Sequence, residues 1–209
     1  VLPLSTAEEA LELITEALER VGHKTKTDIA MDAAASEFYD EENETYQTGV
    51  TTSLPSSQLI EMYTDLVEKF DIVSIEDPFH EDHYEPWRTL QKEVPRNVQI
   101  VGDDLTVSNE KRITMSLDKE LCNALLLKVN QIGTLTEAIE SANLAFENEW
   151  NVMVSHRSGE TEDTFISDLA IGLGSGQIKL GAPARGERTA KYNRILRIED
   201  VLGKETYGY

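Results

Sequence analysis

The sequence has little of several features that mark particular classes of protein. Its 209 residues include one cysteine, Cys122, so no disulfide can form within the chain. This scarcity is typical of a reducing compartment such as the cytoplasm. No window approaches the ~18 apolar residues of a membrane span, so we expect no transmembrane helix. No basic segment followed by an apolar one stands near the N-terminus, so no secretion signal is visible.

Basic residues are also scarce, with 19 Lys and Arg against 39 Asp and Glu, which gives a formal net charge of −20. Such a charge argues against nucleic acid or an anionic membrane surface as the main partner. Hydrophobic residues make up 40% of the chain, which is enough to bury a core. We expect most of the acidic residues to cover a solvated surface. Acidic residues that follow apolar strands need a separate explanation.

Short apolar runs alternate with amphipathic helical segments along the whole chain. The first helix is expected within residues 5–22, where Thr6 and Glu9 have the spacing of a capping box and Gly22 can end it. Thr134 and Glu137 have the same spacing at the start of a later helix. Strands are expected in DIAMDAAA, IVSIEDPF, VQIVGDDLTV, NALLLKV, NVMVSH and GQIKLGAP, and further helices over 56–70, 87–92, 109–117, 134–148, 163–173 and 187–201. This alternation predicts an α/β fold of about six parallel βα units. Without a visible linker, residues 1–209 are expected to form one domain.

Each predicted strand ends on a polar or ionisable residue. These residues are Asp32, Glu76, Asp103, Lys128, His156 and Lys179. Most of their separations are close to the ~30 residues of one βα unit. The carboxyl ends of parallel strands face the same side of a sheet or barrel, where ligand sites form. The sequence therefore predicts one shared functional site at this edge.

Three of the strand-end residues are carboxylates, namely Asp32, Glu76 and Asp103. A cluster of carboxylates is costly unless a cation neutralises it, and ligands that are all oxygen suit Mg²⁺. The alternative is that one or two of them cap a following helix. Asp103 and Asp104 cannot be told apart by position alone, because adjacent strand residues point in opposite directions.

The remaining strand ends are cationic or can become so. Lys128, His156 with Arg157, and Lys179 together would bind an anionic substrate, and Ser158 lies in a turn whose N–H groups can add to an anion site. Two lysines in one site favour a neutral amine base. A metal that holds a carboxylate beside such a base suits proton abstraction α to that carboxylate. For Lys128 alone, a snorkelling side chain at a strand end is the competing explanation.

The chain resembles the enolase family, the phosphopyruvate hydratases. The resemblance rests on MDAAASEFY, SIEDPF, VGDDLTVSN, LLLKVNQIG, VMVSHRSGETEDTFISDLA and GQIKLGAPARGERTAKYN, which occur in the family's order from about Glu8 to Leu202. It implies part of an enolase-type (β/α) TIM-like barrel. It also implies a glycolytic and gluconeogenic lyase of the cytoplasm that reversibly dehydrates 2-phosphoglycerate to phosphoenolpyruvate. Sites with a lysine or histidine base and one or two Mg²⁺ ions are the established pattern of this superfamily.

The resemblance also assigns roles to residues. The implied Mg²⁺ ligands are Asp32, Glu76 and Asp103. Lys128 matches the base that takes the C2 proton, with a metal-stabilised enediolate as the product of that step. The implied substrate-contacting residues are Glu76, His156, Arg157, Ser158 and Lys179, with Arg157 and Ser158 nearest the phosphate. The family is usually dimeric, so a homodimer is implied for the full-length protein.

Some parts of the family pattern are not found within Val1–Tyr209. These parts are the N-terminal α+β domain with its serine loop, the first barrel strands, and a GDEGG loop whose glutamate acts in hydroxide departure. We therefore expect an incomplete barrel here. A non-catalytic enolase-like module for binding or structure is the alternative function. Another member of the superfamily with a different substrate is a third, which HRSGETED and KLGAP disfavour.

Overall fold

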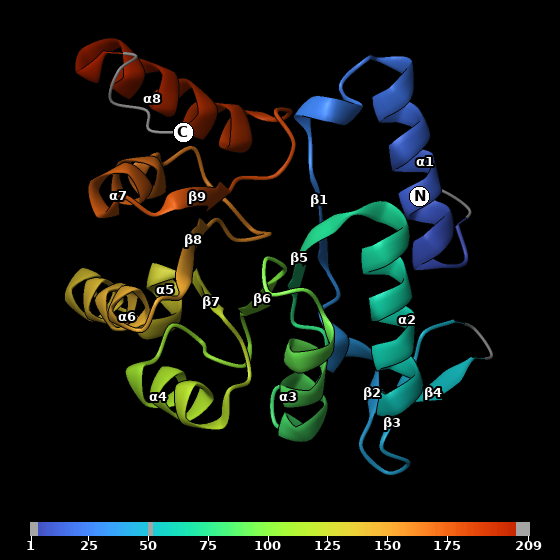
Figure 1. Cartoon of the computed structure of the whole chain (residues 1–209). Coiled ribbons are helices and arrows are strands. Elements are labelled where there is room, and N and C mark those ends of the chain that lie inside the picture. Colours follow the sequence, from blue (N-terminus) through green and yellow to red (C-terminus); the bar gives the residue numbers. More distant parts are fainter. Residues whose placement is uncertain (1–3, 50–51, 204–209) are drawn as a thin grey trace. The chain divides into compact units, whose positions relative to one another are not determined.

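The computed structural model describes residues 4–49 and 52–203. The chain divides into two compact units, the first made of residues 1–105 and 115–123 and the second of residues 106–114 and 124–209. Strands and helices alternate in both, and the paired strands β1, β5 and β6, like β7, β8 and β9, run parallel. Figure 1 shows these elements in chain order. The predicted α/β class is confirmed.

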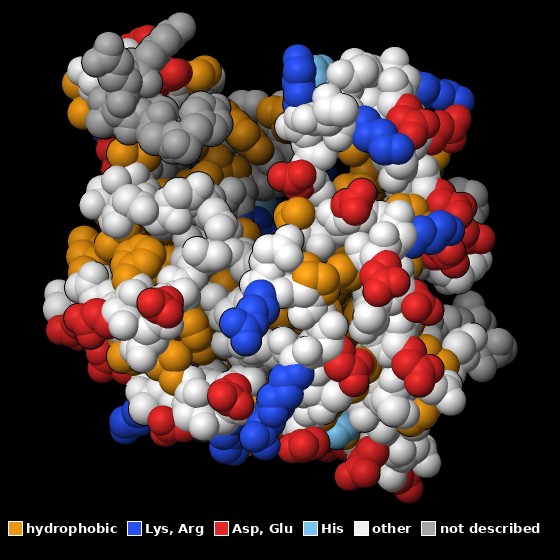
Figure 2. Space-filling view, viewed as in Figure 1, with side chains coloured by type: hydrophobic (Ala, Val, Ile, Leu, Met, Phe, Trp, Pro, Cys, Tyr) orange, Lys and Arg blue, Asp and Glu red, His pale blue; other side chains and the backbone are white. Residues whose placement is uncertain are grey.

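The first unit carries helices beside its parallel strands. Its elements are α1 (Ala7–Arg20), β1 (Ile29–Asp32), β2 (Tyr39–Asp40), β3 (Thr45–Gln47), β4 (Ser53–Pro55), α2 (Ser56–Phe70), β5 (Ile72–Glu76), α3 (Tyr84–Glu93) and β6 (Gln99–Gly102), with short 3₁₀ turns at Lys24–Lys26 and Ala35–Phe38. In Figure 1, α2 lies between α1 and α3 and contacts both, and it also packs on β5. Figure 2 shows many acidic side chains over α1 and α2.

The ends of α1 follow from local chemistry. Thr6 Oγ1 accepts a hydrogen bond from the Glu9 N–H at 3.2 Å, and Glu9 Oε2 accepts one from the Thr6 N–H at 3.3 Å. This reciprocal pair satisfies two N–H groups that the helix leaves unpaired, so the predicted capping box is confirmed. Gly22 follows the helix at φ +70°, a left-handed conformation that glycine adopts without steric cost.

The strands of the first unit have one polar face and one apolar face. Register places Ser74 opposite Gln99, and Asp32 opposite Glu76, on one face. The alternate residues Ile75 and Ile100 are fully buried on the other face. The polar face includes Asp32 and Glu76, which are the last residues of β1 and β5.

The second unit repeats the arrangement. Its elements are β7 (Ala124–Leu127), α5 (Val129–Ile132), α6 (Leu135–Glu147), β8 (Asn151–Ser155), α7 (Phe165–Leu173), β9 (Gly176–Lys179) and α8 (Gly186–Leu202). Helix α4 (Glu110–Lys119) begins in this unit and ends in the first. Helix α6 packs on β7 and β8, and α7 packs on β8, β9 and α8. Thr134 caps α6 by accepting a hydrogen bond from the Glu137 N–H, as its spacing predicts.

The predicted helices and strands are present, and their ends differ by a few residues. The sequence pattern did not indicate the antiparallel sheet β2-β3-β4 or the single-turn helix α5, because elements of two to four residues carry no readable periodicity. Cys122 is buried as a free thiol. Among the described residues, no helix has the length and apolar content that crossing a bilayer requires.

Candidate active site

The strands of both units end on the residues that the sequence indicated. Asp32, Glu76 and Lys179 are the last residues of β1, β5 and β9. The other three strand ends are each followed directly by the indicated residue, which is Asp103 after β6, Lys128 after β7 and His156 after β8. In the first unit, Asp32 pairs with Glu76, and Glu76 pairs with Val101, two residues before Asp103. Because strand side chains alternate, Asp32, Glu76 and Val101 share one face, and Asp103 follows directly after the end of β6. Glu76 is buried at 5% exposure and Asp103 at 9%, whereas Asp32 is exposed.

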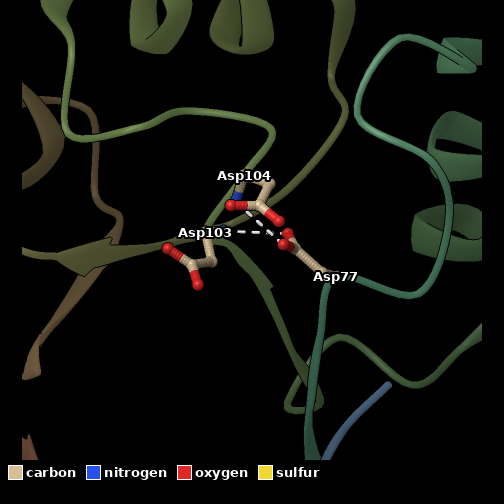
Figure 3. A group of neighbouring side chains, drawn as sticks. All are labelled: Asp77, Asp103 and Asp104. Atoms are coloured by element: carbon tan, nitrogen blue, oxygen red, sulfur yellow. Dashed lines mark hydrogen bonds between the residues drawn. The ribbon is translucent and has the colours of Figure 1, made fainter. Parts of the chain in front are cut away.

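A further acidic residue, Asp77, lies beside these strand ends. Oxygens of Asp77, Asp103 and Asp104 lie within 4.8 Å of one another. Asp77 accepts hydrogen bonds through both carboxylate oxygens, from the Asp103 N–H at 2.9 Å and the Asp104 N–H at 2.8 Å (Figure 3). Burial raises the pKa of Asp77 well above its ordinary value, and these two N–H groups partly oppose that effect. Asp77 therefore fixes the backbone of the Asp103–Asp104 pair.

The two adjacent aspartates are oriented differently. In Figure 3 the Asp103 carboxylate is directed away from Asp77, while the Asp104 carboxylate lies near it. Asp103 is buried and Asp104 is exposed. The two carboxylates therefore differ in burial and direction, which their positions in the sequence could not indicate.

Positive φ angles at residues other than glycine occur just past strand ends of the first unit and at the start of the second, among other places. Ala34 and Asp77 have φ of +45° and +42°, and Val107 and Ser108 have φ of +42° and +52°. Positive φ is costly for residues with a Cβ, most of all for β-branched valine. Such strain persists where the surrounding structure holds it, and it is common at functional sites.

Lys128 is positioned by a buried serine. The Lys128 N–H donates to Ser108 Oγ at 2.8 Å, and that hydroxyl is also 2.9 Å from Gln131 Oε1. Ser141 donates to the Ser108 carbonyl at 2.8 Å. Lys128 has an extended backbone with φ −122°, so the alternation of β7 continues through it. Leu127 pairs with Val154, so the next residues along, Lys128 and Ser155, lie opposite each other. Ser155 in turn pairs with Lys179, and Lys128 and Lys179 therefore share a face.

His156 is half-buried among cations. Burial lowers the pKa of His156, and Arg188, Lys179 and Lys128 lower it further, against a smaller opposing effect of Glu160. Its backbone N–H donates to the Lys179 carbonyl at 3.0 Å, which ties the end of β8 to the end of β9. These interactions bring His156, Lys128 and Lys179 into one electrostatic group.

The loop after His156 is anchored to α8. Glu160 accepts a hydrogen bond from the Arg157 N–H at 3.1 Å and forms an ion pair with the buried Lys191. Arg157 is half-buried and Ser158 is exposed. The loop therefore holds Arg157 and Ser158 at the end of the strand that His156 follows, where they can meet an anion.

Sequence reasoning missed three residues that position this site, namely Asp77, Ser108 and Arg188. Asp77 had a usable signal, because it directly follows a strand-end carboxylate in IEDPF. Ser108 lies in a loop 20 residues before Lys128, and Arg188 lies on α8, 32 residues after His156. Only the fold brings Ser108 to Lys128 and Arg188 to His156.

Two comparisons with known proteins point to the same family. A curated protein named enolase from Methanocaldococcus jannaschii is 53% identical to this chain over 205 residues. The match covers 98% of this chain and 47% of that enolase, so the chain spans about half of its relative's length. A family model described as the enolase C-terminal TIM barrel domain matches residues 2–208. The chain therefore belongs to the enolase family and corresponds to its C-terminal TIM barrel domain.

Proposed function

We propose that these residues serve an enolase, which reversibly dehydrates 2-phosphoglycerate to phosphoenolpyruvate. The observation that carries the proposal is the set of strand ends, where an enolase-family chain presents carboxylates in one unit and lysines with a histidine in the other. Because the chain spans 47% of its relative, the activity is proposed for a protein that contains these residues together with the rest of the enolase length. We also propose that residues 1–209 belong to one barrel domain, and that the whole protein is a cytoplasmic homodimer.

We propose the strand-end carboxylates of the first unit as ligands of a divalent cation. Asp32, Glu76 and Asp103 offer oxygen donors at or directly after strand ends, and Mg²⁺ prefers such ligands. Among the described residues, Asp103 is the one of the three that belongs to a close acidic group, which it forms with Asp77 and Asp104. Glu76 and Asp103 are buried near the ends of adjacent strands, and a divalent cation held there would lower the cost of burying two neighbouring carboxylates. When bound, the metal would supply positive charge that offsets the carboxylate of the substrate.

The residues of the second unit supply the base and the groups that bind the anionic substrate, whereas the acid for departure of the hydroxide is implied for the GDEGG glutamate, which is not found within residues 1–209. Lys128 takes the proton from C2 of 2-phosphoglycerate, and its backbone is fixed for this task by Ser108. Lys179 offsets the substrate carboxylate as negative charge develops on it. Arg157 and Ser158 hold the phosphate, since a guanidinium binds phosphate through paired N–H groups.

Formation of phosphoenolpyruvate from 2-phosphoglycerate, followed by ultraviolet absorbance with Mg²⁺ present, tests the proposal on the whole protein. Replacement of Lys128 by Ala removes the base and should lower kcat by several orders of magnitude. Lys24→Ala is the matched control, because Lys24 forms an exposed ion pair with Glu19 and should leave kcat unchanged. No phosphoenolpyruvate from the wild-type protein, or full activity in Lys128→Ala, would contradict the proposal and favour a non-catalytic module.

A further inference from the structure

Arg188 on α8 makes three polar contacts with the segment that follows β8. Its Nη1 lies 2.5 Å from His156 Nδ1 and 2.8 Å from the Arg157 carbonyl oxygen. Its Nη2 donates to the Ser158 carbonyl at 2.9 Å. One guanidinium thus contacts three consecutive residues for which the family resemblance implies contact with the substrate.

The chemistry of the guanidinium determines where the His156 proton lies. Arginine is protonated at any physiological pH and offers only N–H donors. A nitrogen in contact with such a donor must present its lone pair, so Nδ1 of His156 is the acceptor. The proton of a neutral imidazole then lies on Nε2. We propose that Arg188 is a positioning residue that holds His156 as the neutral Nε2–H tautomer, so that His156 presents a hydrogen-bond donor to the substrate.

The surroundings of His156 support this state. The ring packs closely on Gly181, where an added Cβ would lie 3.1 Å from His156 Cε1. The Tyr192 hydroxyl donates to the Gly181 carbonyl and holds that segment in place. The charged groups that act on His156 are Arg188 from α8, Lys179 from β9, Lys128 after β7 and Glu160 from the loop. Three of these four are cations, which disfavours a charged imidazolium.

The two carbonyl contacts of Arg188 also orient the loop. In a trans peptide the C=O and the following N–H point in opposite directions. Since the carbonyls of Arg157 and Ser158 face Arg188, the N–H groups of Ser158 and Gly159 face away from it. These N–H groups can then bind an anion such as the phosphate of the proposed substrate. This part of the inference rests on the proposed function, whereas the tautomer of His156 does not.

Nuclear magnetic resonance of the ¹⁵N-labelled chain tests the tautomer directly. The chain has four histidines, and loss of a signal in His156→Gln assigns the one of interest. At neutral pH we expect Nε2 to show the shift of a protonated nitrogen and Nδ1 that of an unprotonated one. A proton on Nδ1 of the wild-type ring, or a doubly protonated ring, would overturn the proposal, and the one variant that this measurement needs is His156→Gln for the assignment.

Variants of Arg188 test the cause. Arg188→Met removes the donor and the charge, so His156 should become a mixture of tautomers with a raised pKa. Arg188→Lys keeps a donor and a charge and should preserve the Nε2–H tautomer, and it serves if the Met variant does not fold. Arg194→Gln is the matched control, because Arg194 lies on the same helix but pairs with Asp168. An unchanged His156 spectrum in Arg188→Met would overturn the proposal.

Binding of inorganic phosphate, followed by the amide shifts of Ser158 and Gly159, tests the loop. Arg188→Met should weaken phosphate binding about tenfold, since it removes the hydrogen bonds that orient these N–H groups. Equal phosphate binding by Arg188→Met and Arg194→Gln would overturn this part. Neither measurement depends on catalysis, so an inactive enzyme would contradict the proposed function and leave the positioning role of Arg188 standing.

Discussion

The Nζ of Lys191 lies 2.5 Å from Oε2 of Glu160, which joins α8 to the loop that carries Arg157 and Ser158. The Lys191 side chain is 1% exposed and that of Glu160 is 14% exposed. Lys191 also donates to the carbonyls of Thr161 at 2.8 Å and Glu187 at 2.9 Å, so its ammonium has three acceptors. Burial tends to raise the pKa of Glu160, but hydrogen bonds from Lys191 and the Arg157 N–H outweigh that effect and lower it. The pair is thus a satisfied, buried anchor of the loop.

Replacement of Lys191 by Met should lower the free energy of unfolding by about 3 kcal/mol, because it leaves a mostly buried carboxylate without its partner. Urea unfolding followed by circular dichroism measures this change. Lys24→Met is the control, since it breaks an exposed pair with Glu19 and should cost less than about 1 kcal/mol. Equal losses in the two variants would show that burial adds nothing to the Lys191–Glu160 pair.

Lowering the pH should reduce the free energy of unfolding as Glu160 becomes protonated. Its pKa in the folded chain lies below the ordinary value of 4.5, so the unfolded chain binds the proton more readily. The stabilisation is therefore complete above the ordinary value and is lost as pH falls through the folded pKa. Unfolding free energies measured from about pH 6 to about pH 3 should converge for wild type and Glu160→Gln. A constant difference across that range would contradict the prediction, and Glu16→Gln, in an exposed pair with Arg20, serves as the control.

Mg²⁺ should distinguish the two adjacent aspartates. A ligand that binds only the folded chain raises its melting temperature. Asp103→Asn should abolish the rise that Mg²⁺ causes in wild type, because the Asp103 carboxylate is buried and turned away from Asp77. The neighbouring Asp104→Asn should keep most of the rise, since Asp104 is exposed. The reverse result would move the metal assignment to Asp104, and a loss in both would place the metal on the Asp77 cluster.

Ser108→Ala should lower both the stability of the protein and its kcat, because the Ser108 hydroxyl holds the backbone of Lys128. The substitution removes the acceptor of the Lys128 N–H in a fully buried place, so the free energy of unfolding should fall by about 1–3 kcal/mol. Because the backbone of the proposed base is then less firmly held, kcat should fall about tenfold in the whole protein. Ser53→Ala removes an exposed hydroxyl that donates to Thr45 Oγ1, and should change neither quantity appreciably. An unchanged kcat in Ser108→Ala would limit Ser108 to a structural role.

Local signals in the sequence were enough for the longer helices, for the parallel strands and for the residues at the strand ends. The capping residues Thr6 and Thr134 start their helices as their spacing predicts, because a cap is a contact between residues three apart. Likewise, Asp32, Glu76 and Lys179 end their strands as the apolar runs indicate. The polar residues at the strand ends, together with the family motifs, also indicated the candidate site.

The tertiary structure alone decided how those residues are held. The contacts Ser108–Lys128, Arg188–His156 and Lys191–Glu160 join residues 20 to 32 positions apart, and no periodicity links them. The difference between Asp103 and Asp104 likewise depends on packing, since Asp77 accepts hydrogen bonds from the N–H groups of both residues while their carboxylates take different directions. By itself the sequence determined the parallel α/β pattern and the chemical type of each strand end, because both arise from neighbours along the chain. Packing determined burial, orientation and the placement of protons, because these depend on groups that only folding brings together.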